Sequence, residues 1–264
     1  MVDYAIVSDF MKGAVGGVTK SQLIRYFQET HGCSTDEINQ IIKLCSFRSK
    51  PKDIDYRKIY HTNITRKGNK IFFPFTQMYT LENVLNEDEC EQLMSMIDAS
   101  LRPSTVSDET DSCQVSDYRT SKTSDLHYFD NPLYLELDRR LVECIGIPGF
   151  QGEIMQAQKY EPGQYYKEHW DFFMPTTKEY KIYCEWMGQR TWTAMVYLND
   201  VQEGGETYFK HLKLKIQPKK GMLVAWNNLY KNGLPNLKTM HEACPPISGN
   251  KYVITKWFRS WSLI

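Results

Sequence analysis

The stretch QYYKEHWDFF, residues 164–173, places a histidine and an aspartate two residues apart in a run of aromatic residues. In a helix these two side chains would point to different sides, whereas in a strand residues i and i+2 share one face. The surrounding aromatic residues favour a strand. His169 and Asp171 therefore form half of a metal site on one strand face, and the rest of the chain must supply a further ligand.

The composition of the 264-residue chain favours one large, β-rich domain with a small appendage. Lysine plus arginine equals aspartate plus glutamate, 32 each, so nucleic acid is not an expected partner. No apolar run is long enough to span a bilayer, and the N-terminus lacks a secretory signal pattern. We therefore expect no membrane partner and a cytoplasmic location. The seven cysteines include no Cys-x-x-Cys pair, which indicates free thiols.

Residues 1–70 differ in character from the rest and are interpreted as a small helical region of unknown role. Apolar spacing predicts one helix over 18–32 and a second over 34–47, the latter opened by a capping box. Two helices joined by a glycine-containing turn are typical of a helix-turn-helix, but this pair has no basic recognition helix. A helical cap on the main domain, residues 71–264, is the favoured interpretation.

The main domain combines a few helices with many short strands. The pattern predicts a strand over 70–85, helices over 86–101 and 131–147, and a long polar loop between these helices. From residue 152 onward, short β-type runs are separated by Gly, Pro and Asn turns. This order predicts a mainly β fold with flanking helices, built on a double-stranded β-helix or jelly-roll core.

A third metal ligand is available at His241, which lies at a turn entering the last β-type run. Two histidines and one carboxylate are the ligand set of non-haem Fe(II) oxygenases, which leaves positions open for a cosubstrate and dioxygen. The last run also carries Lys251 and Lys256, which a strand places on opposite faces. Only one of them can face a barrel interior, where a lysine is costly unless an anion pairs with it. The dicarboxylate 2-oxoglutarate supplies such an anion.

Together these residues resemble the prolyl 4-hydroxylase family of 2-oxoglutarate- and Fe(II)-dependent dioxygenases. The spacing His169-x-Asp171, then His241, then Lys251 ten residues later is similar to the family pattern. The resemblance covers roughly residues 72–262. Five blocks carry it: YRTSKTSDL (118–126), KYEPGQYYKEHWDFF (159–173), TAMVYLNDVQEGGETYF (193–209), GMLVAWNN (221–228) and HEACPPISGNKYVITKWF (241–258).

The resemblance implies a role for each matching position. His169, Asp171 and His241 would hold the iron, and Lys251 would bind the 5-carboxylate of 2-oxoglutarate. Three further residues would line the cosubstrate pocket: Tyr160, Thr207 and Tyr197. Five would lie around the substrate: Tyr166, Arg190, Trp257, Arg119 and Ser121.

The implied reaction is hydroxylation of C4 of proline in a peptide or protein, with release of succinate and carbon dioxide. Fe(II), 2-oxoglutarate and dioxygen are its expected cofactor and cosubstrates, with ascorbate as reductant. Two alternatives stay open: the same chemistry on another residue, a free amino acid or a nucleobase, and an inactive binding module. The segment 172–190 departs from the family pattern and is interpreted as a lid or a substrate-shaping insertion.

Overall fold

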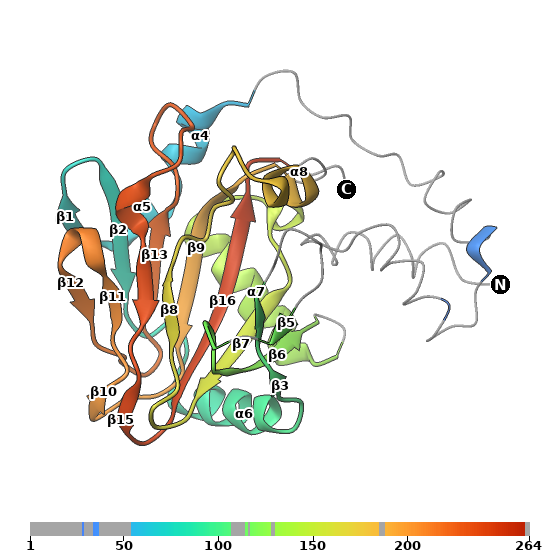
Figure 1. Cartoon of the computed structure of the whole chain (residues 1–264), viewed down its shortest axis with the longest axis vertical. Coiled ribbons are helices and arrows are strands. Elements are labelled where there is room, and N and C mark those ends of the chain that lie inside the picture. Colours follow the sequence, from blue (N-terminus) through green and yellow to red (C-terminus); the bar gives the residue numbers. More distant parts are fainter. Residues whose placement is uncertain are drawn as a thin grey trace.

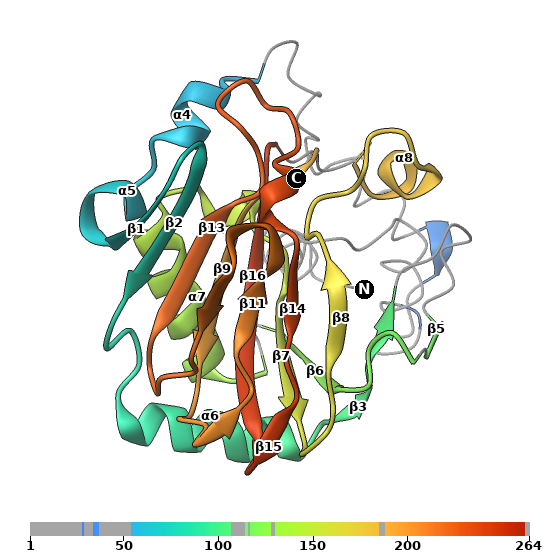
Figure 2. The same ribbon diagram turned by 60° about the vertical axis from the view of Figure 1, so that its left-hand side comes forward.

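Two facing β-sheets form the centre of the computed structural model (Figures 1 and 2), which describes residues 28, 34–36, 54–106, 114–115, 117–127, 130–184 and 188–261. The larger sheet of the described chain has the order β1 (Asn69–Phe73), β2 (Thr76–Leu81), β13 (Leu223–Asn227), β9 (Arg190–Tyr197), β16 (Lys251–Arg259), β7 (Met155–Tyr160), β6 (Lys122–Leu126), β3 (Arg102–Pro103). The smaller sheet has the order β12 (Leu214–Ile216), β11 (Thr207–Phe209), β14 (His241–Ala243), β8 (Tyr166–His169). Two short pairs complete the strands: β10 (Glu203–Gly204) with β15 (Pro246–Ser248), and β4 (Thr105–Val106) with β5 (Gln114–Val115).

The helices lie outside the two sheets. Those described are α4 (Tyr56–Tyr60), α5 (Ile64–Lys67), α6 (Glu87–Asp98), α7 (Pro132–Ile145) and α8 (Lys178–Cys184), with short 3₁₀ turns η1 (Gly149–Gln151), η2 (Lys210–Leu212) and η3 (Leu237–Thr239). The Asn86 side chain caps α6, and Glu89 completes the expected capping box. Helix α7 begins after the Asn131 cap and ends at Gly146, whose φ of +83° suits glycine.

The larger sheet is buried on both faces, and the two-residue period of its strands separates two apolar clusters. On β9, Trp192, Ala194 and Val196 pack toward the helices. Met195 and Tyr197 alternate with them and lie in the cluster between the two sheets. A strand buried on both faces reads as a nearly continuous apolar run, which is the pattern of residues 191–198.

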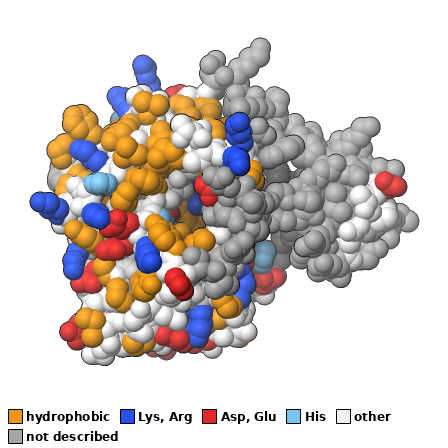
Figure 3. Space-filling view, viewed as in Figure 1, with side chains coloured by type: hydrophobic (Ala, Val, Ile, Leu, Met, Phe, Trp, Pro, Cys, Tyr) orange, Lys and Arg blue, Asp and Glu red, His pale blue; other side chains and the backbone are white. Residues whose placement is uncertain are grey.

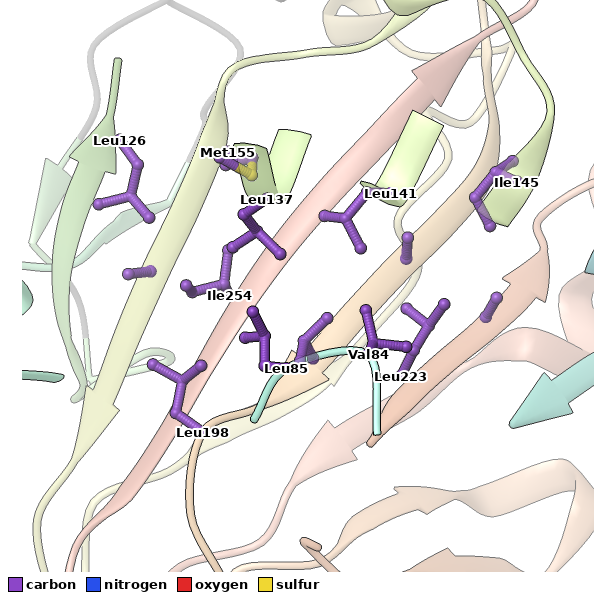
Figure 4. Close-up of a cluster of buried hydrophobic side chains, with 14 of the residues drawn as sticks. Val84, Leu85, Leu126, Leu137, Leu141, Ile145, Met155, Leu198, Leu223 and Ile254 are labelled. Carbon is purple, nitrogen blue, oxygen red and sulfur yellow. The ribbon is translucent and has the colours of Figure 1, made fainter. Parts of the chain in front are cut away.

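The helix-facing cluster holds α7 on the sheet. Figure 4 shows Leu137, Leu141 and Ile145 of α7 facing Ile254 and Leu223 of the sheet, all with no exposed surface. Burying one leucine side chain contributes roughly 2 kcal/mol, so this row alone anchors the helix. The face of the larger sheet opposite these helices remains available for the smaller sheet. The predicted mainly β fold with flanking helices and a jelly-roll core is confirmed.

Residues 54–70 pack on the main domain. Ile64 is fully buried in the helix-facing cluster, and the Trp192 indole donates to the Ile59 carbonyl at 2.8 Å. The expected boundary between residues 70 and 71 falls inside β1, so the domain in the structure starts upstream of it. The helices predicted over 18–32 and 34–47 lie outside the described residues, apart from 28 and 34–36.

Two segments differ in detail from the sequence-based prediction, those over 70–85 and 100–125. The single strand expected over 70–85 is the hairpin β1–β2, which turns at Phe75 with φ of +63°. The stretch expected as one long polar loop contains the short strands β3 to β6. The segment 172–190 contains α8. Among the described residues, Cys90, Cys144, Cys184 and Cys244 are free thiols, and none of the helices there has the length and apolarity to cross a membrane.

Lys256 is a fully buried lysine on the helix side of β16. Its ammonium pairs with Asp138 of α7 at 2.6 Å and donates to the Glu153 carbonyl at 2.9 Å. Gly152 leaves room for it, since a Cβ there would lie 2.6 Å from the Lys256 Nζ. The two lysines of β16 therefore face opposite ways, as the strand period requires, but both are buried.

We expect Asp138→Ala to lower the free energy of unfolding by about 3 kcal/mol, because it leaves the buried Lys256 ammonium without its carboxylate. Urea unfolding measures this loss. Glu143 lies on α7 like Asp138, and its carboxylate forms an exposed ion pair with Lys67 of α5. Glu143→Ala should therefore lower the free energy of unfolding by less than about 1 kcal/mol. Equal effects of the two substitutions would contradict this assignment.

Candidate metal and cosubstrate site

Three candidate ligand side chains converge between the sheets. His169 ends β8 and His241 begins β14, and these strands pair so that the two residues are direct partners. Asp171 follows β8 two residues after His169. One ligand atom from each residue lies within 4.8 Å of the others, which suits a single metal ion, and they form the candidate metal cluster of the described chain. The strand predicted to carry both His169 and Asp171 ends at His169, so Asp171 lies just beyond it in a bend, yet it reaches the same cluster as the predicted third ligand.

Each histidine is oriented by a backbone carbonyl. The Nδ1 of His169 lies 2.8 Å from the Lys167 carbonyl, and the Nδ1 of His241 lies 2.9 Å from the Thr239 carbonyl. A carbonyl oxygen only accepts, so both Nδ1 atoms carry the proton. The Nε2 lone pairs are then free to bind a metal, which is how metal-bound histidines are commonly held.

The Asp171 carboxylate is held in place by a short chain of hydrogen bonds. The Thr193 hydroxyl donates to Asp171 Oδ2 at 2.6 Å and accepts from the Asn228 amide at 2.9 Å. All three residues are at most 5 % exposed. This arrangement fixes one carboxylate oxygen and leaves the other, Oδ1, beside the Nε2 of His169 at 4.0 Å.

The protonation states of these groups suit metal ligation. Burial and the neighbouring His241 lower the pKa of His169 to about 3, so its imidazole is neutral. Burial alone would raise the pKa of Asp171, but the two histidines and the Thr193 hydrogen bond outweigh it and lower that pKa. A neutral His169 imidazole beside an ionised Asp171 carboxylate is the form of each group that binds a divalent cation. The residues present therefore fit Fe(II).

A cavity of about 790 Å³ contains this cluster and extends to Lys251. Figure 3 shows the face of the molecule with apolar and charged side chains mixed around its hollowed centre. Ten of the twelve site residues expected from the sequence line the cavity: His169, Asp171, His241, Lys251, Tyr160, Thr207, Tyr166, Arg190, Trp257 and Arg119. Tyr197 and Ser121 lie behind it.

Lys251 is 1 % exposed and has no carboxylate partner among the described residues. Its ammonium lies 3.5 Å from the Thr207 hydroxyl and over the Tyr160 and Tyr197 rings, at 5.3 and 5.6 Å from their centroids. Tyr197 donates to Thr207 at 2.7 Å and so supports that hydroxyl from behind. The three residues expected around the cosubstrate thus gather at this lysine.

Burial lowers the pKa of Lys251 to about 7, well below that of an exposed lysine. A dicarboxylate bound beside the ammonium would offset this effect, because an opposite charge favours the protonated form. The site therefore has a strong electrostatic preference for an anion at its Lys251 end.

Of the residues expected around the substrate, Tyr166 and Arg119 lie close to the candidate ligand His169. The Tyr166 ring stacks on His169 with 3.6 Å between centroids, and the Arg119 guanidinium lies 4.9 Å from the Tyr166 ring. Ser121 is buried and hydrogen-bonded to the Ser104 hydroxyl at 2.8 Å. Ser121 therefore supports the cavity wall from behind.

Arg190 belongs to an ion cluster that the sequence did not reveal. It donates two hydrogen bonds to Glu153, at 2.6 and 2.7 Å, and its guanidinium lies over Trp257 at 4.1 Å. Arg259 pairs with the same carboxylate at 2.5 Å. Burial alone would raise the pKa of Glu153, but the two arginines outweigh it and lower that pKa. Thr193, which holds Asp171, is another residue that we did not predict.

Two of these residues had a signal in the sequence. Arg259 follows Lys251 and Trp257 at even spacing on β16, so the strand period places it on the cavity face, and it lines the cavity. Thr193 shares a face of β9 with Tyr197 in the same way. Glu153 precedes β7 in an irregular stretch, where no period applies, so only the structure reveals it.

Comparison with known proteins agrees with this geometry. The family model of the 2OG-Fe(II) oxygenase superfamily matches residues 155–259. Prolyl 4-hydroxylase 1 of Arabidopsis thaliana is 32% identical over 199 residues, which cover 69% of each chain. Prolyl 4-hydroxylase subunit alpha-2 of Gallus gallus is 33% identical over 177 residues, which cover 67% of this chain but only 33% of that subunit.

The fold comparison gives the same result. The solved structure of the viral collagen prolyl hydroxylase from Paramecium bursaria Chlorella virus-1, in complex with 2OG, has a TM-score of 0.53 and 25% identity. The alignment covers 68% of this chain and 94% of that one. These matches confirm the resemblance seen in the sequence, and the chain belongs to the prolyl 4-hydroxylase family of Fe(II)- and 2-oxoglutarate-dependent dioxygenases.

Proposed function

We propose that this protein hydroxylates C4 of proline in a peptide or protein, releasing succinate and carbon dioxide. The observation that carries the proposal is the single cavity that joins the three-ligand cluster to the buried, carboxylate-free Lys251. Such a cavity provides a metal site at one place and an anion site at another, as a dicarboxylate cosubstrate requires. The prolyl 4-hydroxylase relatives support the choice of proline.

His169, Asp171 and His241 would hold Fe(II). Bound Fe(II) supplies the dioxygen activation that couples oxidative decarboxylation of 2-oxoglutarate to hydroxylation of the substrate. Lys251 would pair with the 5-carboxylate of 2-oxoglutarate, and the Thr207 hydroxyl beside it would donate or accept one further hydrogen bond. Ascorbate would serve as the external reductant that keeps the iron in its ferrous state.

The remaining walls would position the substrate. Tyr166 and Trp257 both line the cavity, Tyr166 against the ligand His169 and Trp257 against Arg190, and a pyrrolidine ring packs well against aromatic side chains. The Arg190 guanidinium donates one hydrogen bond to the Asp171 backbone carbonyl at 3.3 Å and others to the Glu153 carboxylate. The cavity wall is therefore rigid next to the ligands, which limits access of water to the reacting centre.

A panel of proline-containing peptides tests the proposal. With Fe(II), 2-oxoglutarate and ascorbate, at least one peptide should stimulate succinate release and gain one oxygen on proline by mass spectrometry. His169→Ala should lower this turnover by at least about 100-fold, because it removes a metal ligand. His211→Ala, at an exposed histidine, is the matched control and should retain activity. Wild-type turnover in His169→Ala would refute the assignment.

Binding of 2-oxoglutarate should take up a proton above neutral pH. The pKa of Lys251 is about 7 in the empty site, so at pH 8.5 its amine is neutral and must gain a proton to pair with the dianion. At pH 6 the amine is already charged, so no uptake is expected. Affinity should consequently fall as pH rises above 7.

Calorimetry with Mn(II) in place of iron, in two buffers of different ionisation enthalpy, measures this uptake without turnover. Lys251→Met should abolish it and weaken 2-oxoglutarate binding, whereas Lys231→Met, at an exposed lysine, should change neither. Proton uptake that persists in Lys251→Met would show that another group pairs with the cosubstrate.

A further inference from the structure

Three arginine side chains of the described chain line the cavity, Arg119, Arg190 and Arg259, and two buried carboxylates line it with them: Glu153, and Asp171 of the candidate metal cluster. Arg190 and Arg259 share Glu153, so that cluster keeps one excess positive charge. Arg119 has no carboxylate within ion-pair distance among the described residues. Within the described residues, Arg119 is therefore a buried cation of the cavity wall without an ion-pair partner.

Arg119 is the least compensated of the three. It is 9 % exposed, and its guanidinium donates only to neutral acceptors: the Thr105 carbonyl at 3.2 Å, the Thr123 hydroxyl at 3.3 Å and the Gln156 amide oxygen at 3.0 Å. Its Nε is buried and has no hydrogen-bond partner. A buried, unpaired guanidinium is costly, and an anionic ligand would remove that cost.

Arg119 also lies next to the reacting centre. Its guanidinium contacts the Tyr166 ring, and that ring stacks on the metal ligand His169. The backbones of Arg119 and Tyr166 are joined by a β-bridge, which fixes their relative position. Only the Tyr166 ring would then separate an anion bound at Arg119 from the metal ligand His169. Such an anion would lie beside the residue that is hydroxylated.

The acidic residues around the cavity do not fill this role. Asp125 pairs with Arg102, and Glu168 pairs with Lys210, so each has a surface cation of its own. Glu179, in the first turn of α8, also lines the cavity and is engaged in an interaction of its own. None of the three forms an ion pair with Arg119.

Resting on the proposed function, we propose that the substrate peptide carries a carboxylate next to the hydroxylated proline and that Arg119 binds it. The carboxylate belongs to an adjacent Asp or Glu side chain or to the free C-terminus of the peptide. A guanidinium binds a carboxylate by charge-assisted hydrogen bonds, which are stronger than those to a neutral amide. Arg190 and Arg259 add to the positive potential at this position.

Matched peptides test the substrate class. One set, with both ends capped, places Asp, Asn or Lys directly before or after a single proline. A second set ends in proline with either a free carboxylate or an amide. Peptide-stimulated succinate release gives kcat/KM for each. We expect an acidic peptide to exceed its Asn or amide counterpart by about tenfold, and the set in which this occurs identifies the source of the carboxylate.

Protein variants test the role of Arg119. Arg119→Gln should reduce the ratio of kcat/KM between the acidic peptide and its neutral counterpart to less than about twofold, and Arg119→Lys should restore part of that ratio. Arg66→Gln, at an exposed arginine on α5, removes the same charge far from the cavity and should leave the preference intact. Thermal unfolding of each variant checks that the fold is retained.

Equal kcat/KM for acidic and neutral peptides would overturn the inference and leave proline hydroxylation standing. If no peptide is hydroxylated, the proposed function fails for peptides. Calorimetry of the same peptides with Mn(II) and 2-oxoglutarate present then decides the inference. Equal or absent binding of acidic and neutral peptides overturns it, and tighter binding of acidic peptides that is lost in Arg119→Gln supports it.

Discussion

The free-energy cost of burying charge on the two faces of the larger sheet governs this structure. Lys256 meets the constraint inside the protein, because α7 supplies Asp138 at 2.6 Å. Lys251, five residues earlier on the same strand, is equally buried, and its ammonium lies beside the Thr207 hydroxyl and the Tyr160 and Tyr197 rings, without an ion pair among the described residues. The two buried lysines lie on opposite faces of one strand, and they differ in whether the protein itself supplies the compensating anion. For Lys251 the proposed source of that anion is a bound dicarboxylate, and the cavity extends to this residue.

The alternation of side chains along each strand determines which buried charged residues face the cavity and which face the helices. On β16 it directs Lys251, Trp257 and Arg259 into the cavity and Lys256 toward α7. On β8 it brings His169 into register with His241, and Asp171 follows where the strand ends. Because a shift of one residue would exchange the faces, the two apolar clusters that fix the register also fix the metal ligands. Packing and site geometry therefore depend on the same pairing.

Much of the candidate site could be predicted because His169, His241 and Lys251 lie on strands with a two-residue period. The opposite faces of Lys251 and Lys256 follow from that period alone, whereas Asp171 lies just beyond the end of β8, where the period no longer applies. It could not show that Lys256 is also buried, since its burial depends on where α7 packs. Glu153 was missed because it lies in an irregular stretch, and Arg259 because its carboxylate partner could not be foreseen. The predicted separation at residue 70 overlooked Ile64, whose burial depends on contacts distant in the sequence.

The two ends of the cavity differ in whether a carboxylate of the protein pairs with their buried cations. At the Lys251 end, the cation stands alone, so a single anion completes it. At the substrate end, Glu153 joins Arg190 and Arg259 into a rigid cluster, and Arg259 also donates to the Gly188 carbonyl at 2.9 Å. Gln189 bonds both the Phe173 amide and its carbonyl, at 2.8 and 2.6 Å. The ends of the segment 172–190 are thereby tied to the same cluster, so the charge that would attract a substrate also holds the wall that shapes its site.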